Sequence, residues 1–338
     1  MPGSLDGAAR SVDMGLPLVD AALDIVGMNR ALASTISAVG GRAPRLLGAR
    51  VIDLKPGRRA SIAYEVEGDE GHIFAKHFSD PNRGRRVHRV LVGLGRALQA
   101  RGASVAIPEP LAWIEEPPVL LYRPARGRSL SDAIAAGEPD GASVLGEVGR
   151  CLAEMHDCSL ELDRRFDLDN ETTNLRAWAQ IVAAACPEDG RCAPALAETV
   201  AGALRALRLE AGAPIHKDFR PGHVLVGSGV SFIDFDEMRW GEPSFDLAHF
   251  CTYLHLLGLR KSLPTVRMEM LRRAFLEGHE RRSSCGREGF AAFGIYACLK
   301  IAWQMCSGDG VRSVPAGGEL RRQLRAILQH GQELGETL

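Results

Sequence analysis

The sequence HKDFRPGH occupies residues 216–223 of this 338-residue chain, and IDFD follows at residues 233–236. Between the two motifs lie an apolar run at 224–226, a Gly-Ser-Gly turn at 227–229 and a second apolar run from Val230. Two short apolar runs joined by a glycine-containing turn predict a tight β-hairpin. We therefore expect the hairpin to bring the aspartates of the two motifs close together.

A third motif, GEPSFDLA, follows at residues 241–248. The combined pattern resembles the aminoglycoside phosphotransferase and choline kinase-like family. That family shows His-Gly-Asp, a metal-binding position four or five residues on, then Ile-Asp, and then Gly-x-Pro-x-x-Asp-Leu-Ala with this spacing. The first two motifs are also similar to the catalytic loop and the Asp-Phe-Gly motif of protein kinases. The resemblance spans residues 45–330 and rests mainly on residues 216–248.

The resemblance implies a role for each polar residue of these motifs. Asp218 would accept the proton of an acceptor hydroxyl group, and Asp234 would hold magnesium between the nucleotide phosphates. Arg220 would neutralise charge on the transferring phosphoryl group. His216 and Asp246 would be structural: His216 would bond to the backbone near Asp234, and Asp246 would hold the loop through backbone amides.

One position departs from the family pattern within this region. His223 stands where the family usually has asparagine, and where some sugar-kinase branches have glutamine. A neutral imidazole can bind a divalent ion, so we expect His223 to be a second metal ligand. Magnesium prefers oxygen ligands whereas imidazole suits transition metals, which makes manganese the alternative to magnesium.

The resemblance places the nucleotide site in the preceding part of the chain. Lys76 occupies the place of the strand lysine that pairs the α- and β-phosphates of ATP or GTP. Strand periodicity puts Phe74 on the same face, where its ring could stack on the base. Arg58, in the turn between two predicted strands, could contact phosphate. Backbone groups near Arg123 and Ala125 would bond to the base.

A second departure leaves an alternative function open. The predicted helix at residues 84–101 contains no aspartate or glutamate, so the glutamate that orients the strand lysine in active kinases is missing. Together with His223, this allows a nucleotide-binding or inactive pseudokinase that acts as a binding or regulatory module. The joint presence of Asp218, Asp234 and Lys76 favours a small-molecule kinase instead.

Strand and helix patterns predict an α+β, two-lobed fold of the protein-kinase type. Residues 1–44 read as an N-terminal helical extension. Residues 45–123 read as a nucleotide-binding N-lobe, with one helix and an antiparallel sheet of five strands. Residues 124–338 read as a larger, mostly helical C-lobe with the catalytic loop and the acceptor site. The predicted strands are 49–54, 61–66, 72–78, 108–113 and 119–122, and the predicted C-lobe helices are 141–158, 172–185, 194–210, 246–258, 264–282, 287–306 and 317–334.

Composition limits the partners of the chain. Apolar residues make up 46% and charged residues 25%, as in ordinary globular proteins, and the formal net charge is −1. This balance gives no reason to expect nucleic acid or a charged membrane surface as partner. With no bilayer-length apolar run and no export signal at residues 1–13, a cytoplasmic location is expected. The expected partners are a nucleoside triphosphate and a small hydroxylated acceptor, such as a sugar, an amino alcohol or an aminoglycoside-like compound. Arginines of the last predicted helices, such as Arg267 and Arg272, slightly favour a neutral or anionic acceptor.

Overall fold

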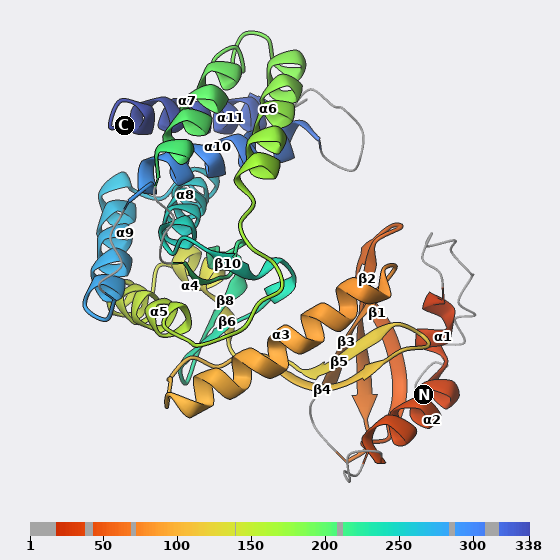
Figure 1. Ribbon diagram of the computed structural model, residues 1–338. Coiled ribbons are helices and arrows are strands. Elements are labelled where there is room, and N and C mark those ends of the chain that lie inside the picture. Colours follow the sequence, from red (N-terminus) through yellow and green to blue (C-terminus); the bar gives the residue numbers. More distant parts are fainter. Residues whose placement is uncertain are drawn as a thin grey trace, which may run out of the picture. The chain divides into compact units, whose positions relative to one another are not determined.

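The computed structural model divides into two compact units, shown in Figure 1. The N-terminal unit comprises Met1–Val92 with Pro108–Pro124, and the C-terminal unit comprises Gly93–Ile107 with Ala125–Leu338. The N-terminal unit holds an antiparallel sheet and the C-terminal unit is mostly helical, which confirms the predicted two-lobed kinase-like fold. The structure describes residues 18–37, 43–68, 72–138, 140–207, 212–283, 288–307 and 318–338.

The N-terminal unit is built on one sheet with the strand order β1-β2-β3-β5-β4, in which all neighbouring strands are antiparallel. Each of the five predicted strands is present: the strand at 72–78 has the predicted bounds, the strand predicted at 108–113 lies one residue later, and the other three are extended by up to three residues at one or both ends. The elements are α1 (Val19–Leu23), α2 (Ile25–Ser37), β1 (Leu46–Lys55), β2 (Arg59–Val66), β3 (His72–Phe78), α3 (Pro81–Ala100, whose end belongs to the other unit), β4 (Glu109–Ile114) and β5 (Val119–Arg123).

The alternation of side chains along β3 separates the two faces of this sheet. Ile73 and Ala75 are buried in the core that α1 and α2 close against the sheet. Phe74 and Lys76 lie on the opposite face and are half-buried. Helix α3 approaches the sheet closely at Gly84, because a Cβ atom there would lie 2.3 Å from the indole ring of a β4 tryptophan. One face of the sheet is thus an apolar core, whereas the face that carries Phe74 and Lys76 is partly exposed.

The C-terminal unit consists of helices around a core that α6, α7, α8, α10 and α11 share. Its small strands form two sheets, β10-β7 and β6-β8-β9. Its elements are β6 (Arg128–Ser129), α4 (Leu130–Ala136), α5 (Gly141–His156), α6 (Leu168–Ala185), α7 (Ala193–Ala206), β7 (Ala213–Ile215), η1 (Pro221–His223), β8 (Val224–Val226), β9 (Val230–Phe232), η2 (Phe235–Glu237), β10 (Arg239–Gly241), α8 (Ser244–Lys261), α9 (Thr265–Glu280), α10 (Phe290–Cys306) and α11 (Gly318–Gly335).

The predicted hairpin is present as β8 and β9, and the turn is closed by a bond from the Gly227 amide to the Gly229 carbonyl (3.1 Å). The outer edge of β9 is also paired. Ala106 donates its N–H to the Val230 carbonyl (3.0 Å) and accepts a bond from the Phe232 amide (2.9 Å). These bonds explain why the segment before β4 belongs to the C-terminal unit although the chain returns to the sheet of the other unit directly afterwards.

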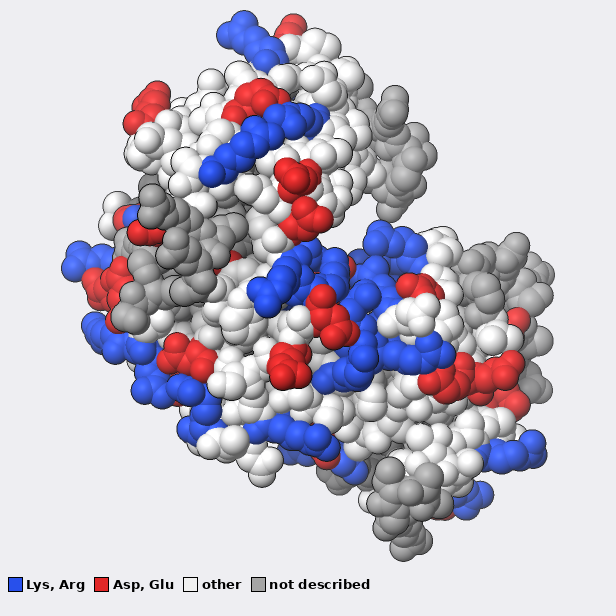
Figure 2. Space-filling model, viewed as in Figure 1, with Lys and Arg blue, Asp and Glu red and all other residues white. Residues whose placement is uncertain are grey.

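Charged side chains of both signs reach the surface. Figure 2 shows Lys and Arg beside Asp and Glu on the face in view. Exposed ion pairs include Arg85–Glu115 at 2.7 Å in the N-terminal unit and Arg176–Glu198 at 2.6 Å in the C-terminal unit. Among the residues that the structure describes, no helix combines the length and the apolar character needed to cross a bilayer.

Candidate active site

The loop between β7 and η1 is held in place by one buried carboxylate. Asp246, in the first turn of α8, accepts hydrogen bonds from the backbone amides of His216 (2.6 Å) and Lys217 (2.9 Å). His156, at the end of α5, donates its Nε2–H to the same carboxylate (3.1 Å). Burial raises the pKa of Asp246, but these bonds outweigh it and hold that pKa below its usual range. The predicted structural role of Asp246 is thus confirmed.

A second bond ties this loop to the strand that follows the hairpin. His216 is fully buried, and its Nε2–H donates to the carbonyl of Ile233 (2.9 Å). The residue after that carbonyl is Asp234, which has a φ of 69° and ψ of 58°, in the left-handed region. Aspartate tolerates this conformation better than most residues. The predicted bond from His216 to the backbone beside Asp234 is therefore confirmed, and it helps to fix where that carboxylate points.

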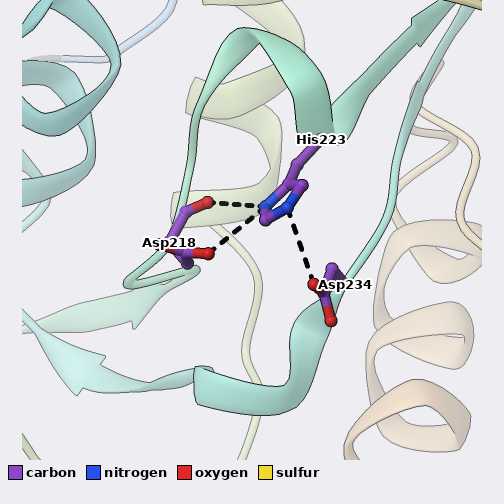
Figure 3. Close-up of side chains that lie close together, drawn as sticks. All are labelled: Asp218, His223 and Asp234. Atoms are coloured by element: carbon purple, nitrogen blue, oxygen red, sulfur yellow. Dashed lines mark hydrogen bonds and ion pairs between the residues drawn. The ribbon is translucent and has the colours of Figure 1, made fainter. Parts of the chain in front are cut away.

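Three ligand-type side chains meet at the end of the hairpin. Potential ligand atoms of Asp218, His223 and Asp234 all lie within 4.8 Å of one another. Figure 3 shows the imidazole of His223 between the two aspartates. Its Nδ1 atom is 3.6 Å from Asp218 Oδ2, and its Nε2 atom is 3.5 Å from Asp234 Oδ2. The two motifs of the sequence therefore converge as the hairpin predicted.

The hydrogen bonds of His223 define its protonation. Its Nδ1–H donates to the backbone carbonyl of Asp218 (2.8 Å), whereas Nε2 accepts a bond from Arg220 Nε (3.0 Å). Burial lowers the pKa of His223 to about 4, with the nearby guanidinium of Arg220 adding to the effect. The ring is consequently neutral near pH 7 and carries its lone pair on the nitrogen that faces Asp234.

This arrangement fits a divalent metal ion. Histidine ligands commonly donate their other ring N–H to a carbonyl or carboxylate, as His223 does to the Asp218 backbone. Two ligands at about 2.1 Å from one ion and roughly 110° apart would be separated by about 3.4 Å. The His223 Nε2 to Asp234 Oδ2 distance of 3.5 Å agrees with that value. Arg220, which occupies the lone pair here, is 41% exposed and so has room to move away.

Asp218 is surrounded by nitrogen atoms. Lys300 Nζ, from α10, lies 2.8 Å from Oδ1, and His249 Nε2, from α8, lies 3.7 Å from the same oxygen. Among the described residues the contacts of Oδ2 are longer, to Arg220 Nε at 3.7 Å and His223 Nδ1 at 3.6 Å. Burial raises the pKa of Asp218, but Lys300 and the other three groups together pull it far below its usual range. Asp218 is therefore a firmly ionised carboxylate with one oxygen engaged and the other more open.

The residue before Asp218 points into the interior. Lys217 has a φ of 69°, and its ammonium lies in a cage of aromatic rings whose centroids are 4.3 to 5.1 Å away. It pairs with Glu171 Oε2 (3.0 Å) and donates to Tyr296 OH (2.9 Å). Arg239 binds the other oxygen of Glu171 (3.1 Å), and all three charged side chains are at most 7% exposed. This network anchors the loop at residue 217 to the interior of the C-terminal unit, and none of the described contacts of Asp218 is to a member of it.

The remaining predicted site residues lie mostly in the N-terminal unit. Phe74 and Lys76 share one face of β3, and the Phe74 ring meets the Tyr122 ring edge-on at 6.2 Å. Arg58 is exposed in the turn between β1 and β2. Arg123 ends β5 and pairs with a glutamate of β4 at 3.2 Å. Ala125 belongs to the C-terminal unit, as do the three clustered ligand-type residues.

Two residues that contact Asp218 were not predicted from the sequence. Lys300 lies 82 positions from Asp218 and His249 lies 31 positions away, so only the packing of α8 and α10 brings them to the loop. A signal for Lys300 does exist, because it is the one charged residue in the sequence FAAFGIYACLKIAWQMC of α10. A charge within an otherwise apolar helix calls for a buried partner or a function.

Comparison with known proteins agrees with this geometry. A model of the phosphotransferase enzyme family matches residues 53–283. No curated protein matches the chain. The solved structures that share its fold include the following three, all at low identity. A spectinomycin phosphotransferase in complex with ADP and spectinomycin has 13% identity and a TM-score of 0.60, covering 92% of this chain and 98% of its own. A choline kinase from Cryptosporidium parvum has 12% identity and a TM-score of 0.60, covering 93% and 97%. A choline kinase from Streptococcus pneumoniae has 13% identity and a TM-score of 0.56, covering 90% and 99%.

Proposed function

The chain belongs to the phosphotransferase enzyme family, and on this premise we propose that it transfers the γ-phosphoryl group of ATP or GTP to a hydroxyl group of a small molecule. The observation that carries the proposal is the cluster of Asp218, His223 and Asp234 at the end of a hairpin whose loop is fixed by Asp246. Such a cluster offers a base and a metal site within one short stretch of chain.

Asp218 would bind the acceptor. The accepting hydroxyl would bond to Oδ2, which has no described contact closer than 3.6 Å, while Lys300 keeps Oδ1 at 2.8 Å. The hydroxyl proton would pass to Asp218 as the hydroxyl oxygen of the acceptor bonds to the γ-phosphorus. The bond from that phosphorus to the bridging oxygen would break, and the nucleoside diphosphate would leave with the electron pair. Catalysis would come mainly from positioning and charge neutralisation.

His223 and Asp234 would hold magnesium or manganese, which when bound neutralises charge on the nucleotide phosphates. Arg220 would then release His223 and turn its guanidinium toward the transferring phosphoryl group, where it can donate in a planar fork. Both proposals are supported by the 3.5 Å separation of the two ligand atoms and by the partial exposure of Arg220.

The nucleotide itself would be held mainly by residues of the N-terminal unit. Lys76 would pair its phosphates, and Phe74 would stack on the base with the nearby Tyr122 ring as lateral support. Arg58 would add a phosphate contact from the turn. Backbone groups at Arg123 and Ala125 would bond to the edge of the base.

The experiment that tests the proposal measures nucleotide turnover with magnesium or manganese across sugars, amino alcohols, hydroxy acids and aminoglycosides. We expect Asp218→Asn to abolish transfer while nucleotide affinity stays within a few-fold, because the base lies apart from the phosphates that dominate nucleotide binding. Asp163→Asn, which alters a carboxylate outside the cluster, serves as the control. Unchanged turnover in Asp218→Asn would refute the role of that residue.

One observation favours a second candidate, a nucleotide-binding module without transfer. Asp218 is held by Lys300, and the His223 lone pair is occupied by Arg220. A carboxylate with a strongly lowered pKa is a weak base, and the acid-free α3 lacks the usual partner for a strand lysine. The two functions differ in one measurement: the module binds nucleotide with metal but forms no phosphorylated product with any acceptor.

A further inference from the structure

Lys300 carries an inference about the acceptor. It lies on α10 amid apolar residues, its side chain is 17% exposed, and its Nζ touches Asp218 Oδ1 at 2.8 Å. Asp218 itself is 24% exposed. A buried ammonium is costly unless it is paired. Both members of this pair still reach solvent, so a small molecule that approaches Asp218 also meets Lys300.

The hydrogen bonds of Lys300 leave one proton unassigned. An ammonium has three protons to donate. One goes to Asp218 Oδ1, and a second goes to His249 Nε2 at 3.3 Å. His249 can accept it because its own Nδ1–H donates to the Phe219 carbonyl (2.8 Å) and because burial lowers its pKa to about 3. Within the described ranges the third proton of Lys300 has no partner, so it can be donated to a ligand.

The side chains next to Lys300 suit an oxygen-rich ligand. Gln304 follows Lys300 by one turn of α10, and its side-chain oxygen accepts a bond from Tyr253 OH of α8 (2.9 Å). The Tyr253 ring lies against the His249 ring at 4.7 Å and against the Arg220 guanidinium at 5.8 Å. The surface beside Asp218 therefore combines an ammonium, an amide and an aromatic ring.

Two cations lie next to Asp218, where the acceptor would bind. Lys300 Nζ and Arg220 Nε lie 2.8 and 3.7 Å from Asp218. Asp234, the second carboxylate of the cluster, instead lies beside His223 at 3.5 Å and would hold the metal ion in the proposed function. Arg272 and Arg273 of α9 do not add to this charge, since they bind glutamates of their own helix at 2.7 and 2.6 Å. The sequence-based argument from those arginines is thus replaced by one from Lys300.

We propose that Lys300 selects the acceptor by binding an anionic oxygen, such as a carboxylate, next to the accepting hydroxyl group. The inference rests on the proposed function, in which that hydroxyl bonds to Asp218. A carboxylate would accept a hydrogen bond from the third proton of Lys300 and pair with its positive charge. An ammonium at the same place would face Lys300 and Arg220 directly, and such like-charge contacts are a means of rejecting wrong ligands. Hydroxy acids and sugar acids are the class that meets these conditions.

The test compares three acceptors of one size: glycerate, glycerol and serinol, which carry a carboxylate, no charge and an ammonium. Binding is measured by calorimetry on the full chain with ADP and magnesium, so that no turnover is needed. Phosphorylation of the same compounds with ATP is then measured. The wild type should bind glycerate most tightly and serinol least, with a difference of roughly tenfold or more.

Variants of the lysine separate selection from folding. Lys300→Met should lose most of the preference for glycerate, and Lys300→Arg should keep it, while Lys261→Met at the exposed end of α8 should change nothing. Lys300→Gln replaces the methionine variant if the latter does not fold. Three results would overturn the inference. The wild type could prefer serinol, or it could bind none of the three compounds up to roughly tens of millimolar. The third such result is the same order of affinities in the wild type and in the Lys300→Met or Lys300→Gln variant. If the protein does not bind ADP, the proposed function is wrong, and this inference fails with it.

Discussion

Replacing Glu171 by glutamine should destabilise the C-terminal unit strongly. The Glu171 carboxylate is 5% exposed and compensates two buried cations, Lys217 at 3.0 Å and Arg239 at 3.1 Å. Removing one partner of a buried ion pair leaves an uncompensated charge, which typically costs about 3–5 kcal/mol. Glutamine keeps the shape and one acceptor oxygen, so the change isolates the charge.

Two features of the network determine how much of this roughly 3–5 kcal/mol of stability the variant should lose. Burial lowers the pKa of Lys217 to about 7 although Glu171 raises it, so without Glu171 that pKa falls further and the lysine can lose its proton rather than stay charged. Arg239 cannot deprotonate, but it keeps a bond to Glu237 at 2.8 Å. Both features reduce the cost, and we expect about 3 kcal/mol at pH 6, where Lys217 is charged in the wild type. For a unit of this size, that corresponds to a fall in Tm of about 6–12 °C.

Urea unfolding followed by tryptophan fluorescence measures the effect. Trp178 is a suitable reporter because its ring lies 5.6 Å from the Tyr296 ring within the same network. The matched control is Glu198→Gln. Glu198 pairs with Arg176 on the surface, so this change should not alter the free energy of unfolding measurably. A Glu171→Gln variant as stable as this control would refute the reasoning. Adding Lys217→Met to Glu171→Gln should restore part of the lost stability, since the unpaired charge is then gone.

Three further predictions concern the metal site and the buried lysine. Asp234→Ala should remove the gain in nucleotide affinity that magnesium gives, as calorimetric titration with and without the ion would measure; equal gains in variant and wild type would place the ion elsewhere. His223→Asn should shift the ratio of manganese- to magnesium-supported activity toward magnesium, because an amide oxygen suits magnesium better than imidazole does. An unchanged ratio would show that His223 is not a ligand. The free energy of unfolding should rise between pH 7 and 9, because burial lowers the pKa of Lys217 to about 7 from 10.5 and the unfolded chain then binds more protons. Lys217→Met should flatten that rise, and an identical slope in both proteins would contradict it.

The hairpin and its aspartates were predictable because their signals are local. Apolar runs on both sides of Gly227 and Gly229 specify two strands and a turn without help from the rest of the chain. The anchor at Asp246 was also predicted, since it follows the hairpin within one recurring motif. The five strands of the N-terminal sheet were found by the same alternation. Short helix α4 was missed, because its seven residues are too few for a clear helical period.

The surroundings of the loop could not be predicted, because they depend on packing over long separations. Lys217 illustrates this. The family pattern has glycine at this position, and the left-handed backbone, with a φ of 69°, is one that glycine adopts without strain. Lysine there costs about 1–2 kcal/mol in backbone energy. It is held by Glu171, 46 positions earlier in the chain, and by the ring of Tyr296, 79 positions later. No local pattern relates these three residues.

The lowered pKa of Asp218 also bears on the choice between a kinase and a binding module. A carboxylate held by Lys300 cannot retain a proton near neutral pH, so it cannot remove one from a hydroxyl of ordinary acidity before the phosphoryl group arrives. In a loose transition state, however, the acceptor oxygen bonds to phosphorus late, and its proton becomes acidic only then. Asp218 would need only to orient the hydroxyl until that moment. A weak base is therefore compatible with transfer, and in the proposed function the contact with Lys300 would limit which acceptors are oriented without preventing transfer.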